Sequence, residues 1–440
     1  MRGKMMLPVS VFLMLIVAAV VPTNGLYLYG KGRVLYVGGS GEGNYSSIQQ
    51  AVDDAADGDT VFVYSGVYNE SVLVNKQIKL IGESRDSTII AAASGYAINV
   101  TANNVEVSQF TITGSSYPHA GIVAYEVENL NIHDCNFENN DCGLSVFSSY
   151  SSTISGCDFL DGFSGIVLVQ SHDVMVSDCT ISNITSGVFS KYAGNISGFE
   201  GCGISLEGCQ NVTISNNQIT LSDIAISLWS ASHNNISLNT LHDNIGGILL
   251  APYSDYNTVS ENTITQEDSF GISVQGGSFN RISQNDVEAC KGWCGICIVK
   301  GWSQGNNISE NRIVHSKIGI SVEGVKNTVY RNNISLNTDF GLYLGSFLAT
   351  KCRGNVIQKN NFINNNVDAS FCTPVLSFNR WIGNYWSGHS SGPKIISGKI
   401  RIPVTPFYAI ELPWINVDLH PAKEPLSLTE PAEGFEPSTW

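Results

Sequence analysis

The sequence, 440 residues long, predicts an all-β fold: a single-stranded parallel β-helix, a solenoid built from coils of 22 to 24 residues. Three observations lead to this prediction: a repeated apolar motif, a second apolar register within each repeat, and a column of cysteine and asparagine residues. Only 14% of the residues are charged, against about 25% in an average globular protein. Together with the 43 glycines, this composition disfavours a helical bundle.

The repeated motif is a small residue followed by Ile or Leu, any residue, and an aliphatic residue. Successive copies begin 22 or 24 residues apart, except for one step of 38 residues. The eleven copies begin at Ala97, Gly121, Gly143, Gly165, Gly203, Ala225, Gly247, Gly271, Gly295, Gly319 and Gly341. A period of this length is typical of solenoids, propellers and repeat arrays.

Each repeat also contains an aliphatic residue followed five positions later by another apolar residue, as in Ile214 and Ile219. This spacing predicts two or three short strands per repeat, with apolar side chains facing inward and polar ones outward. A propeller blade needs four strands in about 40 to 45 residues. Three short strands in a 22-residue repeat therefore favour one coil of a parallel β-helix.

A column of equivalent residues lies three positions after the first aliphatic residue of that register. Its members are Cys135, Cys157, Cys179, Asn217, Asn239, Asn262, Asn285, Asn311, Asn332 and Asn360. In stacked coils they would lie about 4.8 Å apart, where each amide can hydrogen-bond to the next. We interpret the column as a structural ladder; the alternative is a row of ligands.

The two ends of the rod are expected to differ from its coils, because a solenoid must cover its terminal strands. Residues 45–56 predict a short helix, capped by Ser46 or Ser47 and ended near Gly58. We expect the β-helix with its N-terminal cap over residues 34–366, a C-terminal cap over 367–428 and a tail over 429–440.

The first 25 residues predict an export segment. Arg2 and Lys4 precede an apolar run over residues 5–21, which is typical of a signal peptide. We expect cleavage between Thr23 and Leu26, an extracellular, cell-surface or periplasmic location, and membrane attachment only if the segment stays uncleaved. The net charge of −15 excludes broad nucleic-acid binding, because such a surface repels phosphate backbones.

Several segments resemble known β-helix families. Residues 46–83 resemble the start of right-handed β-helix proteins of the pectate-lyase-like superfamily. The G-I-x-V and N-x-I-S-x-N repeats resemble the NosD-like family, often labelled periplasmic copper-binding β-helix proteins, and residues 379–386 and 415–425 look like its closing segments. The resemblance covers roughly residues 34 to 426 and implies a right-handed coil. Such repeats occur on enzymes, surface proteins and accessory proteins alike.

The family label directs attention to copper, whose reduced ion prefers sulfur ligands. Cys290, Cys294 and Cys297 are the best candidate metal ligands; a disulfide or unrelated buried thiols are the alternatives. Eleven cysteines in an exported chain suggest disulfides. The pair that we expect first is Cys352 with Cys372, whereas Cys135, Cys157 and Cys179 would form a buried thiol stack.

A second hypothesis is a polysaccharide lyase or hydrolase. Asp134, Asp158 and Asp178 are the candidate catalytic residues, beside the insertion over residues 182–202 with Lys191 and Tyr192. Asp134 and Asp178 fall in one column two coils apart, which suits a carboxylate pair or a calcium site. Ordinary turn chemistry is the competing explanation, since Asp is a common turn residue.

The third hypothesis, which we favour, is binding of a polysaccharide or another extended cell-surface partner without catalysis. Tyr150, Trp229, Tyr253 and Trp302 follow the G-I-x-V strand, as do Tyr256 and Phe347. Aromatic side chains on turns can contact sugar rings, or they can simply cover the core. The same strand carries Ser145, Ser205, Ser227, Ser273 and Ser321, which we expect to form an outward row of hydroxyl groups.

Overall fold

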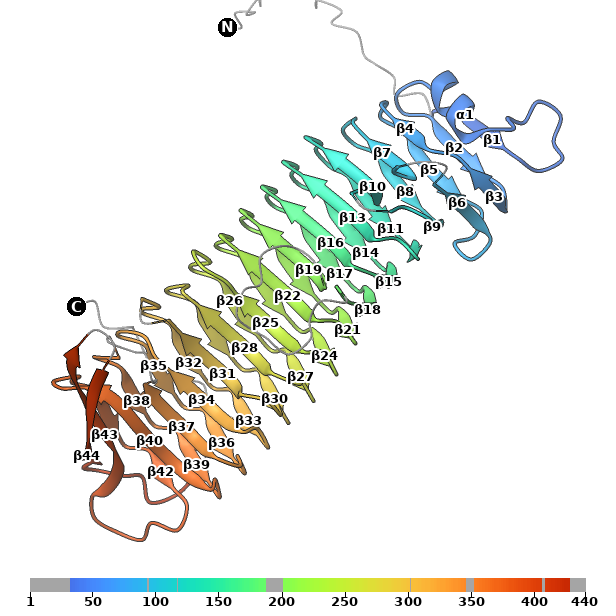
Figure 1. Cartoon of the computed structure of the whole chain (residues 1–440). Coiled ribbons are helices and arrows are strands. Elements are labelled where there is room, and N and C mark those ends of the chain that lie inside the picture. The colour runs from blue at the N-terminus through green and yellow to red at the C-terminus, as the bar shows by residue number, and fades with distance from the viewer. Residues whose placement is uncertain are drawn as a thin grey trace, which may run out of the picture.

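A computed structural model describes residues 32–92, 95–116, 118–186, 201–300, 302–345, 352–405 and 408–427. These residues wind into one elongated solenoid, whose coils follow one another from the N-terminal to the C-terminal end (Figure 1). Most coils contribute three short strands, and each strand pairs in parallel with its counterparts in the neighbouring coils. The predicted all-β parallel β-helix is confirmed.

The strands form three parallel stacks, which we name sheet 1, sheet 2 and sheet 3 in the order in which the chain visits them within a coil. Sheet 1 consists of β1 (Val34–Val37), β2 (Thr60–Val63), β5 (Lys79–Gly82), β8 (Glu106–Ser108), β11 (Asn131–His133), β14 (Thr153–Ser155), β17 (Met175–Ser177), β20 (Thr213–Ser215), β23 (Asn235–Ser237), β26 (Thr258–Ser260), β29 (Arg281–Ser283), β32 (Asn307–Ser309), β35 (Thr328–Tyr330), β38 (Val356–Gln358), β41 (Arg380–Ile382) and β44 (Tyr408–Asp418). Sheet 2 consists of β3 (Gly66–Asn69), β6 (Thr88–Ala91), β9 (Thr111–Thr113), β12 (Asn136–Glu138), β15 (Asp158–Gly162), β18 (Thr180–Ile184), β21 (Gln218–Thr220), β24 (Thr240–His242), β27 (Thr263–Thr265), β30 (Asp286–Glu288), β33 (Arg312–Val314), β36 (Asn333–Ser335), β39 (Asn361–Ile363) and β42 (Tyr385–Trp386). Sheet 3 consists of β4 (Val72–Val74), β7 (Ile98–Val100), β10 (Ala120–Tyr125), β13 (Cys142–Phe147), β16 (Ser164–Val169), β19 (Cys202–Glu207), β22 (Ile224–Trp229), β25 (Gly246–Leu250), β28 (Phe270–Gln275), β31 (Cys294–Val299), β34 (Ile318–Val322), β37 (Phe340–Gly345), β40 (Val367–Pro374) and β43 (Lys394–Thr405).

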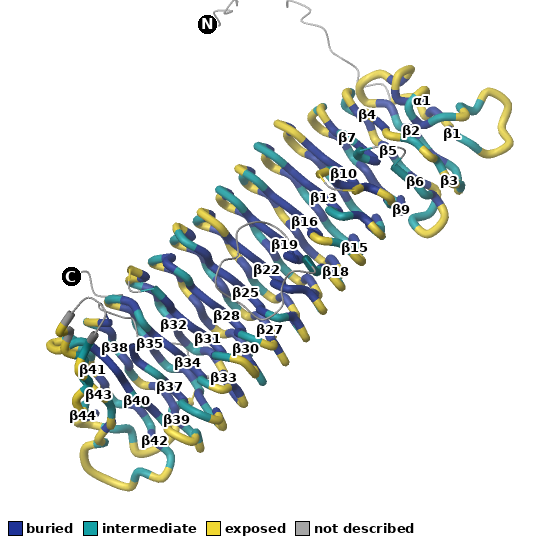
Figure 2. The backbone as a smooth tube through the Cα atoms, viewed as in Figure 1, coloured by how far each residue is buried: buried dark blue, intermediate teal, exposed yellow. Residues whose placement is uncertain are grey.

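The core runs through the middle of the coil as columns of aliphatic side chains. Ile132 pairs in register with Ile154, for example, and both are fully buried. Figure 2 shows buried residues along the strands over the whole length of the rod, with exposed residues concentrated at turns and ends. Each coil thus buries its apolar side chains against the next coil, as expected for a solenoid.

The N-terminal cap is the helix α1 (Ile48–Asp54). Ser47 is its N-cap and accepts a hydrogen bond from the Gln50 N–H at 3.4 Å, which confirms one of the two predicted caps. Ile48, Ala51 and Val52 are buried, so the helix covers the first coils with an apolar face.

The C-terminal end differs from the expected boundary at residue 366. Strands β40, β41 and β42 continue the parallel pairing as far as Trp386, although the G-I-x-V motif has ended by then. The coil needs only the alternation of inward and outward side chains, so the motif underestimates its length. Antiparallel pairing of β43 with β44 then joins sheet 3 to sheet 1.

Two long asparagine ladders run inside the turns. In the predicted column, the Asn239 Nδ2 donates to Asn262 Oδ1 at 2.9 Å, and Asn262 repeats this contact with Asn285. A second ladder, which we did not predict, lies between sheet 3 and sheet 1. It contains Asn234, Asn257, Asn280, Asn306, Asn327, Asn355 and Asn379. The ladders satisfy buried amide groups where the backbone turns.

All eleven cysteines are free thiols, so the expected bridge between Cys352 and Cys372 is wrong. Cys352 instead lies inside the coil and points its thiol at the Val322 carbonyl, whereas the thiol of Cys372 lies 3.8 Å from the Glu411 carboxylate. The buried stack of Cys135, Cys157 and Cys179 is confirmed, because all three are at most 1% exposed.

None of the helices within the described ranges has the length and hydropathy of a membrane span. The expected export segment at residues 1–25 and the tail from residue 429 lie outside those ranges.

Candidate functional site

Asp134 and Asp178 lie where the chain turns from sheet 1 to sheet 2, two coils apart, with Gly156 between them. All three have left-handed backbone, with φ of 52°, 56° and 59° for Asp134, Asp178 and Gly156. Among residues with a side chain, Asp adopts this conformation at comparatively low cost. Turn geometry therefore accounts for the residue type at these positions.

Asp158 begins β15 and is held by an arginine from far along the chain. Arg85, in the turn between β5 and β6, donates from Nη2 to Asp158 Oδ2 at 2.8 Å and from Nη1 to the Gly156 carbonyl at 3.3 Å. The two residues are separated by 73 positions. Residue spacing does not predict this contact, because neither residue belongs to a repeated motif.

A histidine beside Asp134 links two further charged residues. His133 Nδ1 lies 2.8 Å from Asp134 Oδ2, and its Nε2 lies 3.4 Å from Glu106 Oε1. Lys79 Nζ lies 2.8 Å from the other oxygen of Glu106. Burial alone would raise the pKa of Glu106, but Lys79 and His133 outweigh it and lower that pKa below its usual value.

We call this group the carboxylate corner: Lys79, Arg85, Glu106, His133, Asp134 and Asp158. Asp134 and Asp158 each have a cationic or imidazole partner, as buried or half-buried carboxylates usually do. Among the described side chains, none forms a hydrogen bond or ion pair with Asp178. The predicted neighbours Lys191 and Tyr192 lie outside the described residues. The structure thus places two of the three predicted carboxylates in ion-pair networks rather than in an open pair.

The four predicted aromatic residues lie at the end of a sheet 3 strand (Trp229) or on the turns that lead from sheet 3 to sheet 1. We call these strand ends and turns the turn edge. Tyr150, Trp229, Tyr253 and Trp302 expose 45%, 39%, 74% and 61% of their surfaces. Lys300 Nζ lies 5.8 Å from the centre of the Trp302 ring. A side chain at Gly276 would collide with that ring, since its Cβ would lie 2.4 Å from Trp302 Nε1. Phe347 lies outside the described residues.

Other aromatic residues on the same edge stack on each other. The Tyr256 ring lies 5.2 Å from His233 and 5.1 Å from Phe279, with planes only 12° apart. The Phe279 ring also covers Gly305. Tyr125 and Phe147 stack in the same way at 4.8 Å. Stacked rings cover each other's faces, so they have less face left for a ligand than Tyr253 or Trp302.

The expected outward row of serine hydroxyl groups is wrong. Ser145, Ser205, Ser227, Ser273 and Ser321 are all buried, with at most 8% exposure. They lie beside a second apolar cluster that includes Ile224, Leu249 and Phe270. Strand alternation predicted the face correctly, but this part of the outer face of sheet 3 is itself buried, since Leu249 beside Ser227 and Ser273 is only 2% exposed.

The predicted metal ligands do not come together as a set of three. Within the described ranges, no group of three or more His, Cys, Asp or Glu residues could hold a metal ion. Cys290, Cys294 and Cys297 are fully buried. Burial raises the pKa of Cys290 and Cys294 above the ordinary thiol value, which disfavours the thiolate that metals require.

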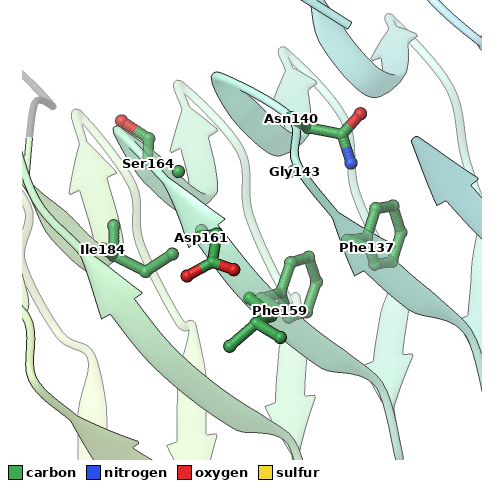
Figure 3. A pocket seen from close by; sticks show the side chains of 10 residues that line it. Phe137, Asn140, Gly143, Phe159, Asp161, Ser164 and Ile184 are labelled. Carbon is green, nitrogen blue, oxygen red and sulfur yellow. The ribbon is translucent and has the colours of Figure 1, made fainter. Parts of the chain in front are cut away.

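Two hollows among the described residues lie in different parts of the rod. The first lies between Phe137, Phe159 and Asp161 (Figure 3), and it has no volume that a water molecule could occupy (0 Å³). The second, of about 380 Å³, lies at the C-terminal end of sheet 3. It is lined by Phe340, Tyr343, Ser370, Phe371, Cys372, Ser397, Gly398, Lys399 and Glu411. Neither hollow contains a predicted site residue.

The coil and its repeats define a right-handed parallel β-helix protein. A family model described as "Right handed beta helix region" matches residues 67–198. The model described as "Periplasmic copper-binding protein (NosD)" matches residues 164–304 and 298–399, more than half of the chain. The chain therefore belongs to the NosD family.

Two curated proteins are similar in sequence. A cell surface glycoprotein of Methanothermus fervidus is 28% identical over 312 residues, which are 66% of this chain and 50% of that protein. A probable pectinesterase/pectinesterase inhibitor of Arabidopsis thaliana is 30% identical over 126 residues, 27% of this chain and 22% of that protein. The chain thus spans half of the first relative and about a fifth of the second.

Solved structures share the fold at low sequence identity. Tailspike protein 3 of bacteriophage CBA120 has a TM-score of 0.61 at 12% identity, over 81% of this chain and 62% of that one. The Dettilon tailspike protein has a TM-score of 0.53 at 14% identity, over 84% and 74%. A DFA-IIIase from Arthrobacter chlorophenolicus has a TM-score of 0.51 at 15% identity, over 68% and 94%. At this identity the similarity concerns the fold alone.

Proposed function

We propose that the protein is exported to the cell surface, where its turn edge binds a polysaccharide or another extended partner without catalysing a reaction. The observation that carries this proposal is the exposure of Tyr150, Trp229, Tyr253 and Trp302 along one edge. The cell-surface relative supports the location, and the expected export segment agrees with it.

The spacing of the coils suits a linear ligand. Trp229 and Tyr253 belong to neighbouring coils, and Trp302 follows two coils after Tyr253. Neighbouring coils are about 4.8 Å apart, so these three side chains are spread over roughly 15 Å along the rod. An extended chain of sugar rings could contact them in succession through their apolar faces.

A second candidate function is a polysaccharide lyase or hydrolase at the carboxylate corner. The observation that favours it is the approach of Arg85 and His133 to the predicted carboxylates. Against it, a general acid or base must be able to exchange its proton with a substrate. Asp134 and Asp158 are both engaged by neighbouring side chains.

Copper and calcium are not part of this proposal. The family description names copper, but Cys290, Cys294 and Cys297 are buried, and burial raises the pKa of the Cys290 and Cys294 thiols. Within the described residues the three cysteines form no group that could hold a metal ion. We expect no tight, saturable binding of copper. Replacing all three cysteines by serine should therefore leave copper binding unchanged.

One experiment separates binding from catalysis. The purified protein is applied to a glycan array, and each retained glycan is then incubated with the protein in solution. We expect retention without new reducing or unsaturated ends, and we expect Tyr253→Ala combined with Trp302→Ala to abolish retention. The matched control is Phe279→Leu, which changes a ring that is stacked on Tyr256.

Two results would contradict the proposal. Product formation that disappears in Asp178→Ala, with the fold intact by circular dichroism, would establish the enzyme instead. Retention that is equally strong in the double variant would show that the turn edge is not the binding surface.

A further inference from the structure

The chain contains nine Asn-x-Ser/Thr sequences, the acceptor pattern for N-linked glycans. They begin at Asn44, Asn69, Asn99, Asn183, Asn195, Asn211, Asn235, Asn307 and Asn333. The repeat itself generates this pattern, so the letters alone cannot tell an acceptor from a structural residue. Asn195 lies outside the described residues; the structure separates the other eight.

Three of these eight sequences are identical, Asn-Ile-Ser, yet their asparagines differ in exposure. Asn235 and Asn307 both occupy the first position of a sheet 1 strand, in β23 and β32. Asn235 is exposed, whereas the Oδ1 atom of Asn307 is buried without a hydrogen-bond partner. The Oδ1 atom of Asn333, in sheet 2, is buried in the same way. Asn235 is therefore the most exposed of the three asparagines, and its Nδ2 donates to the Ser237 hydroxyl group, in the same acceptor sequence, at 3.4 Å.

A second matched pair carries the sequence Asn-Val-Thr. Asn211 is exposed and has left-handed backbone (φ 55°) on the turn edge, just before β20. Asn99 is the central residue of β7, and its Oδ1 atom is buried without a partner. A glycan at Asn211 would extend from a turn, where loops tolerate bulky additions. A glycan at Asn99 would start from a half-buried residue within a strand.

The remaining sequences differ in the state of Nδ2, the atom that a glycan would modify. Asn44 donates Nδ2 to the Gly38 carbonyl at 2.6 Å, and Asn183 donates Nδ2 to Asp161 Oδ1 at 2.5 Å. Asn69 is exposed at the end of β3. Its side chain thus resembles Asn211 and Asn235 in accessibility.

We propose that Asn69, Asn211 and Asn235 carry N-linked glycans in the exported protein, and that Asn99, Asn307 and Asn333 do not. The donor is an oligosaccharide joined through its anomeric carbon to a polyprenyl phosphate or diphosphate. Asn Nδ2 attacks the anomeric carbon and forms the C–N bond while losing one proton. The bond between that carbon and the phosphate oxygen breaks, and its electron pair leaves with the phosphate.

The proposal has a consequence for the turn edge. Asn211 and Asn235 belong to neighbouring coils, because β20 pairs with β23. Trp229 ends β22, just before the turn that leads to Asn235 at the start of β23. Glycans at these positions would shield this part of the edge, while Trp302 lies further along the rod. The modification can be measured whether or not the edge binds a polysaccharide.

The test uses the full chain, exported by a host that makes such a donor, and glycopeptide mass spectrometry. We expect a glycan on Asn69, Asn211 and Asn235, and loss of one glycan mass in Asn211→Gln and in Asn235→Gln. Ser237→Ala removes the acceptor pattern while keeping Asn235, so it should give the same loss if Asn235→Gln folds poorly. Asn307→Gln, the matched control, should lose no glycan mass.

A glycan on Asn99, Asn307 or Asn333 would overturn the proposal. So would an unmodified Asn69, Asn211 or Asn235 in protein from that host.

Discussion

The turn between sheet 1 and sheet 2 has a different buried side chain in the N-terminal coils and in the later coils of the rod. Between sheet 1 and sheet 2, the N-terminal coils place Cys135, Cys157 and Cys179 at the buried position, and later coils place asparagine there. Each cysteine points its thiol at the carbonyl two residues earlier, at 3.3 to 3.4 Å. The asparagines reach the same carbonyl, as Asn285 does with Ser283 at 3.1 Å.

Asparagine adds contacts between coils that cysteine makes only weakly. Asn285 Nδ2 also donates to the Val259 carbonyl and to Asn311 Oδ1, both at 2.9 Å. Its Oδ1 accepts from the Asn262 backbone N–H and from Asn262 Nδ2. In the thiol column the N–H groups of Cys135 and Cys157 face a sulfur, which is a weak acceptor, whereas the Cys179 N–H donates to Asn217 Oδ1 at 3.0 Å. The comparison indicates that a small buried donor suffices for the turn, and that the amide additionally ties the coils together.

The largest expected effect comes from breaking the ladder in its middle. Asn285→Ala leaves the N–H of the buried Asn262 without its acceptor and removes one of the three acceptors of Asn262 Nδ2. It also removes the donor that Asn285 Nδ2 provides to the Val259 carbonyl. Buried unpaired groups cost about 1–3 kcal/mol each, so we expect a loss of about 4 kcal/mol in the free energy of unfolding. Urea unfolding measures it. Gln284→Asn, at the exposed left-handed position next to it, should change little; an equal loss there would argue against the ladder.

The C-terminal end of the ladder is closed by a carboxylate. Asp418 Oδ2 accepts from the N–H and Nδ2 of Asn384 at 2.8 and 3.0 Å, and Oδ1 accepts from the Gly383 N–H at 3.0 Å. A carboxylate can only accept, which suits the last member of a ladder of donors. We expect Asp418→Ala to cost about 3 kcal/mol and to expose β41 and β42 to limited proteolysis. Unchanged proteolysis of these strands would show that the hairpin alone holds the end.

Buried polar side chains also lie in the turns between sheet 2 and sheet 3. At one of these positions, next to Asn244, the chain has the carboxyl group of Glu267. Glu267 is fully buried, and its Oε2 has no partner, although Asn244 Nδ2 donates to Oε1 at 3.2 Å. Burial raises the pKa of Glu267 to about 8 from an ordinary value of 4.5. The folded state therefore holds a proton that the unfolded state has released between these two pH values.

It follows that the free energy of unfolding falls as the pH rises from about 5 to about 8. Glu267→Gln should remove this slope, so the variant should gain stability over the unsubstituted protein as the pH rises from 4 toward 8. Chemical unfolding at a series of pH values measures the difference, with the exposed Glu261→Gln as control. A slope that persists in the Glu267 variant would assign it to other groups.

The smallest effect is expected in the thiol column. Cys157→Ala removes a buried side chain whose only polar contacts are weak sulfur interactions. We expect a loss of about 1 kcal/mol, well below that of Asn285→Ala. A loss as large as in the asparagine ladder would mean that the two columns contribute equally.

Periodicity predicted much of the fold, because each coil repeats the same local requirement. The Asn239–Asn262–Asn285 column and the Ser47 cap followed directly from residue spacing and are confirmed. The second ladder was not predicted, although Asn234 and Asn257 recur with the same period. This recurrence is enough to predict the ladder, because residues one period apart stack in neighbouring coils.

The candidate site was harder to predict, because its contacts depend on residues outside the repeat. Arg85 reaches Asp158 from a turn that the motif does not describe. The serine row was placed on the correct face, but that face is buried and also contains Ile224, Leu249 and Phe270, and alternation alone does not predict such burial. The paired rings of Tyr256 and Phe279 depend on turn conformation, with φ of 57° and 56°, which sequence spacing leaves open.

Hydrogen exchange of backbone amides tests the difference between the two columns most directly. The N–H groups of Asn239, Asn262 and Asn285 each donate to the amide oxygen of the next coil, at 3.0, 3.1 and 2.9 Å, whereas those of Cys135 and Cys157 face sulfur atoms. We predict that the three asparagine amides exchange at least about tenfold more slowly than the two cysteine amides, which corresponds to about 1.4 kcal/mol in opening free energy. Equal exchange rates in the two columns would contradict the claim that the asparagine ladder ties the coils together.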